Sequence, residues 1–411
     1  IFSKDIEINV RDTEKSVITS FLASIAKKRT ILVLSLTSLI LVASILGISK
    51  LEVENSFINY FDKETEIYKG MKKIDDDLGG TTPLNVILKF PVIEKDKTDD
   101  EFSEWDEDSS SKNEEKSKYW FTRDKMDKIL KVHDYLDSLP EIGKVLSFGS
   151  ILRVAEDLNQ KELQSLEIAV LYSKIPVEIK KEIISPYISV EKDEARISVR
   201  IKDSQDKLRR NDLIEKIQND LNTKIGLNKE EYKLAGVLIL FNNLLQSLFK
   251  SQILTLGIVM LGIFAMFFIL FRNLSLSIIG VVPNFIAAFF ILGIIGLMEI
   301  PLDMMTITIA AITIGIAVDN SIHYIYRFKE EFKKINDYNK TLDRCHSTVG
   351  IAILNTSITI VFGFSILVLS NFIPTIYFGF FTGLAMLLAM ISVLTLLPKL
   401  LLIYKPFDKD Y

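Results

Sequence analysis

The chain alternates between long stretches without charge and one long stretch that is rich in charge. No charged residue occurs between positions 31 and 49, and only Lys399 is charged between 350 and 404. Between 253 and 326 the charged residues are Arg272, Glu299, Asp303 and Asp319. A helix needs about 20 apolar residues to cross the hydrocarbon core of a membrane. The pattern therefore predicts a polytopic protein with six membrane-spanning helices, at about 31–49, 253–271, 276–297, 304–326, 350–370 and 376–402.

The region between the first two predicted spans, residues 50–252, has a different pattern. Apolar residues at helical spacing and β-prone runs alternate along it, at 63–77, 84–90, 123–138, 195–201, 208–225 and 232–240. This alternation predicts an α+β domain with helices packed on a sheet. Within it, residues 94–118 hold eleven acidic residues and five lysines, a net charge of −6. Because this run lacks the glycine-turn spacing of a calcium loop, we interpret it as a solvated, flexible insert.

Overall composition conceals the difference between these zones. Hydrophobic residues make up 48% of the 411 residues and charged residues 25%, and the net charge is −4. These values are ordinary for a soluble protein, but the mean hydropathy is positive, at +0.26. The charge balance argues against nucleic acid as a partner. One cysteine and three scattered histidines exclude an internal disulfide and make a Cys/His metal cluster improbable.

Basic residues gather at one side of the predicted spans. They precede the first span, join spans two and three, and follow spans four and six. Because such residues are retained in the cytoplasm, both termini are expected there and the large domain on the opposite side of the membrane. The predicted order is a cytoplasmic amphipathic lead-in (1–30), a span (31–49), the external domain (50–252), three spans (253–326), a cytoplasmic amphipathic connector (327–349), two spans (350–404) and a cytoplasmic tail (405–411).

Asp319 is a carboxylate inside the fourth predicted span. A carboxylate at the centre of a membrane helix costs about 2.5–3.5 kcal/mol on insertion. Such residues usually face a protein interior and serve the movement of ions or protons. Burial disfavours the charged form of a carboxyl group. We therefore expect Asp319 to be buried and to take up and release a proton, with a purely structural hydrogen-bonding role as the alternative.

The neighbours of Asp319 on its own helix share one face. Ala311, Gly315 and Asp319 recur every four residues, which favours close approach of another helix. His323 is the next position on this face, and its titration near neutral pH suits a proton relay. An interfacial histidine in contact with water is the other interpretation of His323.

The fifth and sixth predicted spans supply further polar and small residues. Polar groups that are candidate partners of Asp319 are Asn355, Thr356, Ser357 and Thr359. They could equally form hydrogen bonds between helices. Gly379 and Gly383 form a G-x-x-x-G pattern in the sixth span, which predicts close helix packing.

The stretch 313–332, TIGIAVDNSIHYIYRFKEEF, resembles the fourth-span signature of the resistance-nodulation-division (RND) superfamily, and its MMPL-like branch in particular. Further matching segments, in the same order along nearly the whole chain, are 234–241, 283–284, 300–302, 355–357, 363–364 and 370–379. The resemblance implies a transporter of twelve spans in two repeats. Each repeat has one span, an extracytoplasmic porter domain of ferredoxin-like βαβ units, and five further spans.

By this resemblance the chain corresponds to one repeat. Its short tail and its isoleucine start suggest the carboxy-terminal half, so the amino-terminal half is an expected partner. Asp319 matches the family aspartate that relays protons. The position after it is often tyrosine or aspartate in the family but is Asn320 here, which leaves the relay partner open.

The resemblance implies export of hydrophobic or amphiphilic molecules, such as lipids and drugs, from the inner membrane. Protons would be the coupling ion and no other cofactor is expected, while accessory envelope proteins or further copies of the chain are candidate partners. The alternatives are a lipid- or sterol-sensing protein and a SecDF-like component of protein export. An enzyme is not indicated, because the sequence contains no nucleophile–base pair, phosphate-binding loop or metal-ligand spacing.

Overall fold

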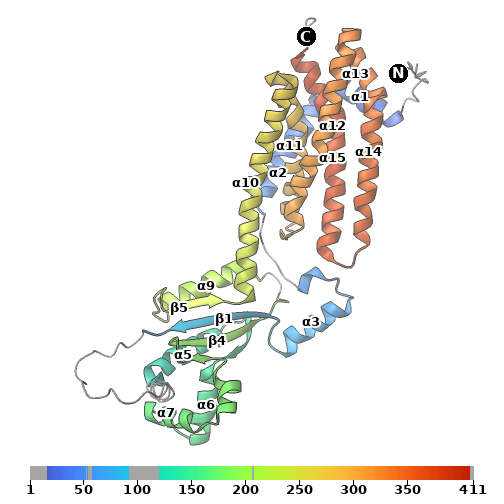
Figure 1. Ribbon diagram of the computed structural model, residues 1–411. Coiled ribbons are helices and arrows are strands. Elements are labelled where there is room, and N and C mark those ends of the chain that lie inside the picture. The colour runs from blue at the N-terminus through green and yellow to red at the C-terminus, as the bar shows by residue number, and fades with distance from the viewer. Residues whose placement is uncertain (1–15, 52, 54–57, 92–119, 206–207, 408–411) are drawn as a thin grey trace, which may run out of the picture. The chain divides into compact units, whose positions relative to one another are not determined.

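The computed structural model describes residues 16–51, 53, 58–91, 120–205 and 208–407 (Figure 1). The predicted acidic insert 94–118 lies outside these residues, as do the beginning of the lead-in and the end of the tail. The chain divides into two compact units. One, here the membrane unit, combines Ile1–Asn55 with Leu245–Tyr411, and the other, here the α+β unit, is Ser56–Leu244.

Within the described residues, six helices are long and apolar enough to cross a membrane, which confirms the predicted polytopic architecture. They are α2 (Thr30–Ile48), α10 (Val237–Phe271), α11 (Leu274–Leu297), α12 (Thr306–Ile335), α14 (Val349–Ser365, extended to Leu369 by the 3-10 turn η3) and α15 (Ile373–Tyr404). Helices α11, α12 and α15 pack together and are largely buried, whereas α2, α10 and α14 are largely exposed. Two shorter helices complete this unit, α1 (Val17–Lys28) and α13 (Tyr338–Ser347).

The crossing of α2 and α11 is set by glycines on both helices. A Cβ atom added to Gly47 would overlap the backbone of Gly293, and one added to Gly296 would overlap the carbonyl group of Gly47. The two backbones are therefore in direct contact, which only residues without a side chain permit.

The α+β unit is built on an antiparallel sheet with the strand order β2-β4-β1-β5. Its elements in chain order are η1 (Ile58–Tyr60), α3 (Glu66–Asp77), β1 (Thr82–Lys89), α5 (Arg123–Asp137), β2 (Ile142–Leu146), α6 (Phe148–Asn159), α7 (Ser165–Lys174), α8 (Val177–Ile179), η2 (Lys180–Ile184), β3 (Ile188–Ser189), β4 (Glu194–Ile201), α9 (Arg210–Thr223) and β5 (Tyr232–Ala235). Val86 of β1 lies opposite Ile197 of β4 and Leu234 of β5. Alternate residues of β1 and β4 join a core with α5 and α9, as the period of two in a strand requires.

The sequence placed most of these elements but not all of their boundaries. The predicted strand 232–240 ends at Ala235, because Gly236 adopts a φ of +113° and α10 begins at Val237. The fourth span continues to Ile335 as one helix, nine residues beyond its predicted end at 326. Helices α6, α7 and α8 lie in a segment for which no element was predicted.

Candidate functional site

Asp319 lies on α12 one helical turn before His323. Asp319 Oδ1 is 3.3 Å from His323 Nε2, and the two side chains are 71% and 65% exposed within this chain. The prediction that the chain itself buries Asp319 is therefore wrong. Its cause is geometric, since the face of α12 that carries Asp319 is turned away from the helices of the membrane unit.

The same face carries the small residues that were predicted to allow close helix approach. A Cβ atom on Gly315 would meet nothing within 4 Å, and Ala311 is only partly buried. Tyr326, further along the helix, is exposed. We call Gly315, Asp319, His323 and Tyr326 the open face of α12. Nothing among the described residues packs closely on Gly315.

Behind the open face, α12 contacts α11 through polar groups. Asn320 and Ser321 are buried. Asn284 of α11 donates from Nδ2 to Ser321 Oγ (3.2 Å) and to the carbonyl oxygen of Gly280 (3.0 Å). Among the residues that the structure describes, Asn284 Oδ1 has no hydrogen-bond partner. One feature of the sequence indicates this contact, namely an Asn directly after Pro283 within an apolar span, but its role was not predicted.

The polar groups of α14 are not brought to Asp319. Thr356 donates to the carbonyl oxygen of Ala352, and Thr359 donates to that of Asn355, so both hydroxyls bond within their own helix. Asn355 is exposed, whereas Ser357 is buried and its hydroxyl has no hydrogen-bond partner in the described ranges. Within the described part of the chain, no hydrogen bond joins these residues to Asp319.

Gly379 and Gly383 of α15 face α14. A Cβ atom on Gly379 would lie 2.6 Å from the carbonyl oxygen of Phe364, and one on Gly383 would lie 3.9 Å from Val361. The contact is tight at Gly379 and ordinary at Gly383. The glycine at 379 is therefore the one that the helix pair requires.

His346 of α13 joins three helices and was not singled out from the sequence. Its Nδ1 lies 3.1 Å from Tyr324 Oη of α12 and 3.0 Å from the carbonyl oxygen of Leu342. Its Nε2 lies 2.8 Å from the carbonyl oxygen of Leu394 of α15. Burial lowers the pKa of His346 from its ordinary value, which favours the neutral ring. A neutral ring with its proton on Nε2 donates to the carbonyl oxygen of Leu394 and accepts from the Tyr324 hydroxyl at Nδ1, and the carbonyl oxygen of Leu342 then receives no hydrogen bond from that nitrogen.

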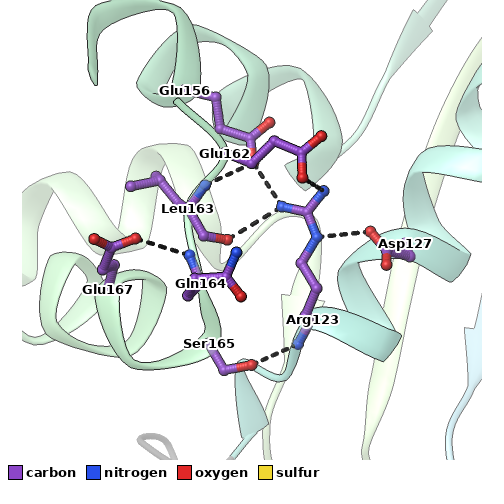
Figure 2. Close-up of polar contacts among 8 residues, drawn as sticks. All are labelled: Arg123, Asp127, Glu156, Glu162, Leu163, Gln164, Ser165 and Glu167. Atoms are coloured by element: carbon purple, nitrogen blue, oxygen red, sulfur yellow. Dashed lines mark hydrogen bonds and ion pairs between the residues drawn. The ribbon is translucent and has the colours of Figure 1, made fainter. Parts of the chain in front are cut away.

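In the α+β unit, Arg123 organises the corner between α6 and α7 (Figure 2). Its Nη1 donates to Glu156 Oε1 (2.7 Å) and to the carbonyl oxygen of Leu163 (3.1 Å), and its Nε pairs with Asp127 (2.8 Å). The backbone N–H of Arg123 donates to Ser165 Oγ (2.9 Å). The hydrogen bond to Glu156 raises the pKa of Arg123 further, so this charge is permanent.

Two hollows with mainly apolar walls complete the candidate surfaces. One, of about 610 Å³, is lined by residues of α6, α7 and their connection, namely Ala155, Leu158, Asn159, Leu163, Leu166, Glu167, Val170, Leu171 and Lys174. The other, of about 310 Å³, lies in the membrane unit and is lined by Leu41, Phe264, Ile278, Val281, Val282, Phe285 and Ile286. The larger volume lies within the range that is typical of small-molecule sites, and the smaller volume lies at the lower end of that range.

Comparisons with known proteins agree with this architecture. The model of the MMPL family matches residues 122–407. The membrane protein MJ1562 of Methanocaldococcus jannaschii is 34% identical to the chain over 154 residues, a match that covers 38% of this chain and 40% of that protein. The chain thus spans less than half the length of this relative, whose name assigns it no substrate.

Proposed function

Because the chain belongs to the MMPL family of RND-type transporters, we propose that it forms one half of a transporter that exports hydrophobic or amphiphilic molecules and is driven by the proton gradient. The observation that carries this proposal is the Asp319–His323 pair on the open face of α12. A carboxylate and an imidazole one turn apart can exchange a proton. Ionisable side chains inside membrane spans are costly and usually serve ion or proton movement.

The open face of α12 is suited to contact with helices from outside this chain. Left against lipid, an aspartate and a histidine in a membrane span are unfavourable. Another helix can approach closely at Gly315, where no side chain stands in the way. We propose that the amino-terminal repeat half covers this face and so completes the burial of Asp319 that the sequence led us to expect.

Proton binding at Asp319 would act on the rest of the membrane unit through the buried side of α12. Ser321 connects α12 to α11 through Asn284, and Tyr324 connects it to α13 and α15 through His346. Moving one charge through 100 mV supplies about 2.3 kcal/mol, which is enough to shift a packing equilibrium of a few kcal/mol.

We propose that the α+β unit is a ferredoxin-like porter unit on the extracytoplasmic side of the inner membrane, with both chain termini in the cytoplasm. The β-α-β, β-α-β order and the strand order β2-β4-β1-β5 support the ferredoxin-like assignment. The two apolar hollows are the surfaces where an apolar substrate would be sheltered from water.

The test is proton-driven transport by the complete protein in proteoliposomes, with a fluorescent amphiphile as substrate and an imposed pH gradient. Asp319→Asn keeps the size of the side chain but cannot release a proton, and it should reduce gradient-driven transport at least about tenfold, an effect typical of the loss of a positioned acid–base group. Glu330→Gln, on the same helix beyond the open face, is the matched control and should transport normally.

Unchanged transport by Asp319→Asn would exclude the proton-relay role. A ligand response that survives collapse of the gradient would favour a lipid- or sterol-sensing protein instead.

A further inference from the structure

The helix α1 presents three different faces along its length. Successive residues of a helix are rotated by about 100°. One face is buried within the membrane unit and holds Thr19, Leu22, Ala23 and Ala26. A second face is apolar yet exposed, and its members Val17, Ile18 and Phe21 are 83%, 51% and 64% exposed. The third face is polar and exposed, and holds Ser20 and Ser24. A helix in water needs only two faces, one apolar and one polar.

The place of α1 in the chain explains why it has a third face. Only Arg29 separates α1 from the membrane span α2. The carboxyl end of α1 therefore lies at the boundary between the membrane and water. At this boundary an apolar face that does not touch protein is stabilised by lipid chains, while the polar face stays in water.

Contacts at this end of α1 fix how the helix is turned. Lys27 forms an ion pair with Asp343 of α13. The ammonium group of Lys399 on α15, which is buried, donates to the carbonyl oxygen of Lys27 (3.3 Å), an interaction that stabilises the end of a helix. The exposed apolar face is thus held in position by two other helices.

Cations flank the same junction. Lys28 and Arg29 follow Lys27 directly, Arg344 follows Asp343, and all three are exposed. Within the residues that the structure describes, none of the three has a carboxylate partner. Each basic residue close to an anionic membrane surface contributes about a fivefold gain in affinity. Their long aliphatic stems allow the charges to reach the headgroups while the helix lies lower.

We infer that α1 is a lipid-docking helix, in which Val17, Ile18 and Phe21 enter the boundary between headgroups and acyl chains. Lys28, Arg29 and Arg344 form a site for the phosphate of an anionic phospholipid. This assignment requires only that the chain is embedded in a membrane, so it does not depend on proton-driven export.

The chain offers a direct test, because its one cysteine, Cys345, is buried. A cysteine placed on α1 can therefore be labelled selectively with a fluorophore. Phe21→Cys reports the apolar face and Ser20→Cys, its neighbour on the polar face, is the matched control. Each labelled chain is placed in nanodiscs in which either phosphatidylglycerol or phosphatidylcholine carries brominated acyl chains that quench fluorescence.

Quenching at position 21 should be at least about twice that at position 20, since an interfacial helix buries its apolar face by about 5–10 Å. Brominated phosphatidylglycerol should quench position 21 more than brominated phosphatidylcholine at the same mole fraction. The combined variant Lys28→Gln, Arg29→Gln and Arg344→Gln should abolish this preference. In the chain that keeps Lys28, Arg29 and Arg344, raising the salt concentration should weaken the preference for phosphatidylglycerol. This measurement tests the site without a substitution in it.

Equal quenching at positions 20 and 21 would overturn the assignment of the apolar face. Equal quenching by the two lipids would overturn the headgroup site. A preference for phosphatidylglycerol that persists in the triple variant and in high salt would also overturn it, because another feature would then select the lipid.

Discussion

Two aspartates, one in each unit, occupy opposite environments. Asp75 of α3 is fully buried in the α+β unit, where its carboxylate accepts hydrogen bonds from Thr81 N and Oγ1 (both 2.9 Å), Asp203 N (2.8 Å) and Ser204 N (2.8 Å). Asp319 is exposed and has His323 as its partner. Burial raises the pKa of Asp75, but the donors of Ser204, Asp203 and Thr81 outweigh it and leave the pKa below its ordinary value.

The comparison separates a carboxylate that is held by several donors of the fold from one that, among the described residues, contacts a single neighbouring side chain. Asp75 is saturated with donors and keeps its charge at all ordinary pH values. Among the described residues, Asp319 has no comparable set of backbone donors, and His323 on the next turn of α12 is the partner that it contacts. The sequence marked Asp319 as unusual because it lies in a membrane span. What distinguishes it from Asp75 in the structure is the number of hydrogen-bond donors around each carboxylate.

The largest expected effect is the loss of stability in Asp75→Ala. The substitution leaves buried N–H groups of Thr81, Asp203 and Ser204 without an acceptor, and each unsatisfied donor costs about 1–3 kcal/mol. We expect the free energy of unfolding of the α+β unit to fall by at least about 3 kcal/mol. Both tryptophans fall in the sequence of this unit, so tryptophan fluorescence during denaturation is the measurement.

The neighbouring exposed residue Asp76 provides the matched control, and Asp76→Ala should change stability by less than about 0.5 kcal/mol. Asp319→Asn should also leave this unfolding transition unchanged. The contrast between the two units fails if Asp75→Ala and Asp319→Asn have equal effects on stability.

A smaller effect is expected for the histidine that joins the membrane helices. In His346→Phe the carbonyl oxygen of Leu394 and the hydroxyl of Tyr324 lose their partner, at a cost of about 2 kcal/mol. Thermal loss of helical circular dichroism in detergent micelles should therefore begin at a lower temperature. His323→Phe, an exposed position only one residue from Tyr324, should melt like the unsubstituted chain. Equal melting of the two variants would show that the buried junction does not hold the helices together.

The pH dependence of stability should differ between the units in a defined direction. The pKa of Asp75 is lowered in the folded state, so its contribution is complete above its unfolded pKa of about 3.9 and is lost as the pH falls through the folded value. The α+β unit should therefore lose stability below about pH 4. Asp75→Asn should flatten this part of the profile. The measurement is the midpoint of the tryptophan fluorescence transition at a series of acidic pH values, and an identical acid profile in both proteins would contradict the prediction.

The smallest effect is expected on the open face itself. Gly315→Ala adds a Cβ atom that meets nothing within 4 Å, and alanine favours a helix over glycine by about 0.5–1 kcal/mol. The chain alone should be unchanged or slightly more stable, as measured by the temperature at which a thiol-reactive dye reaches buried Cys345.

In the complete protein, Gly315→Leu should impair transport if another helix packs against the open face. Normal transport by Gly315→Leu would contradict the proposed covering of this face.

The sequence was sufficient for features that depend on residues close together along the chain. Uncharged windows located the six spans, and the spacing of four placed Asp319 and His323 on one face. Two boundaries were nevertheless missed, because the predicted ranges 63–77 and 232–240 ran past Thr65, which caps α3, and Gly236, which ends β5.

The remainder depends on partners that are distant in sequence. The hydrogen bonds of Asp75 to residues 203 and 204 span 128 and 129 positions, and that of Lys399 to Lys27 spans 372. No local pattern indicates such a pairing. For the same reason the sequence could not tell that the face of Asp319 is open within this chain while that of Ser321 is buried, because both residues lie in the same apolar span.

The glycine crossing of α2 and α11 limits how the membrane unit can change shape. Where two backbones touch, a slide or rotation of one helix brings side chains into the space that only Gly47, Gly293 and Gly296 leave free. A change of shape that separates α2 from α11 would have to break this contact along the whole crossing, so we expect the two helices to move together.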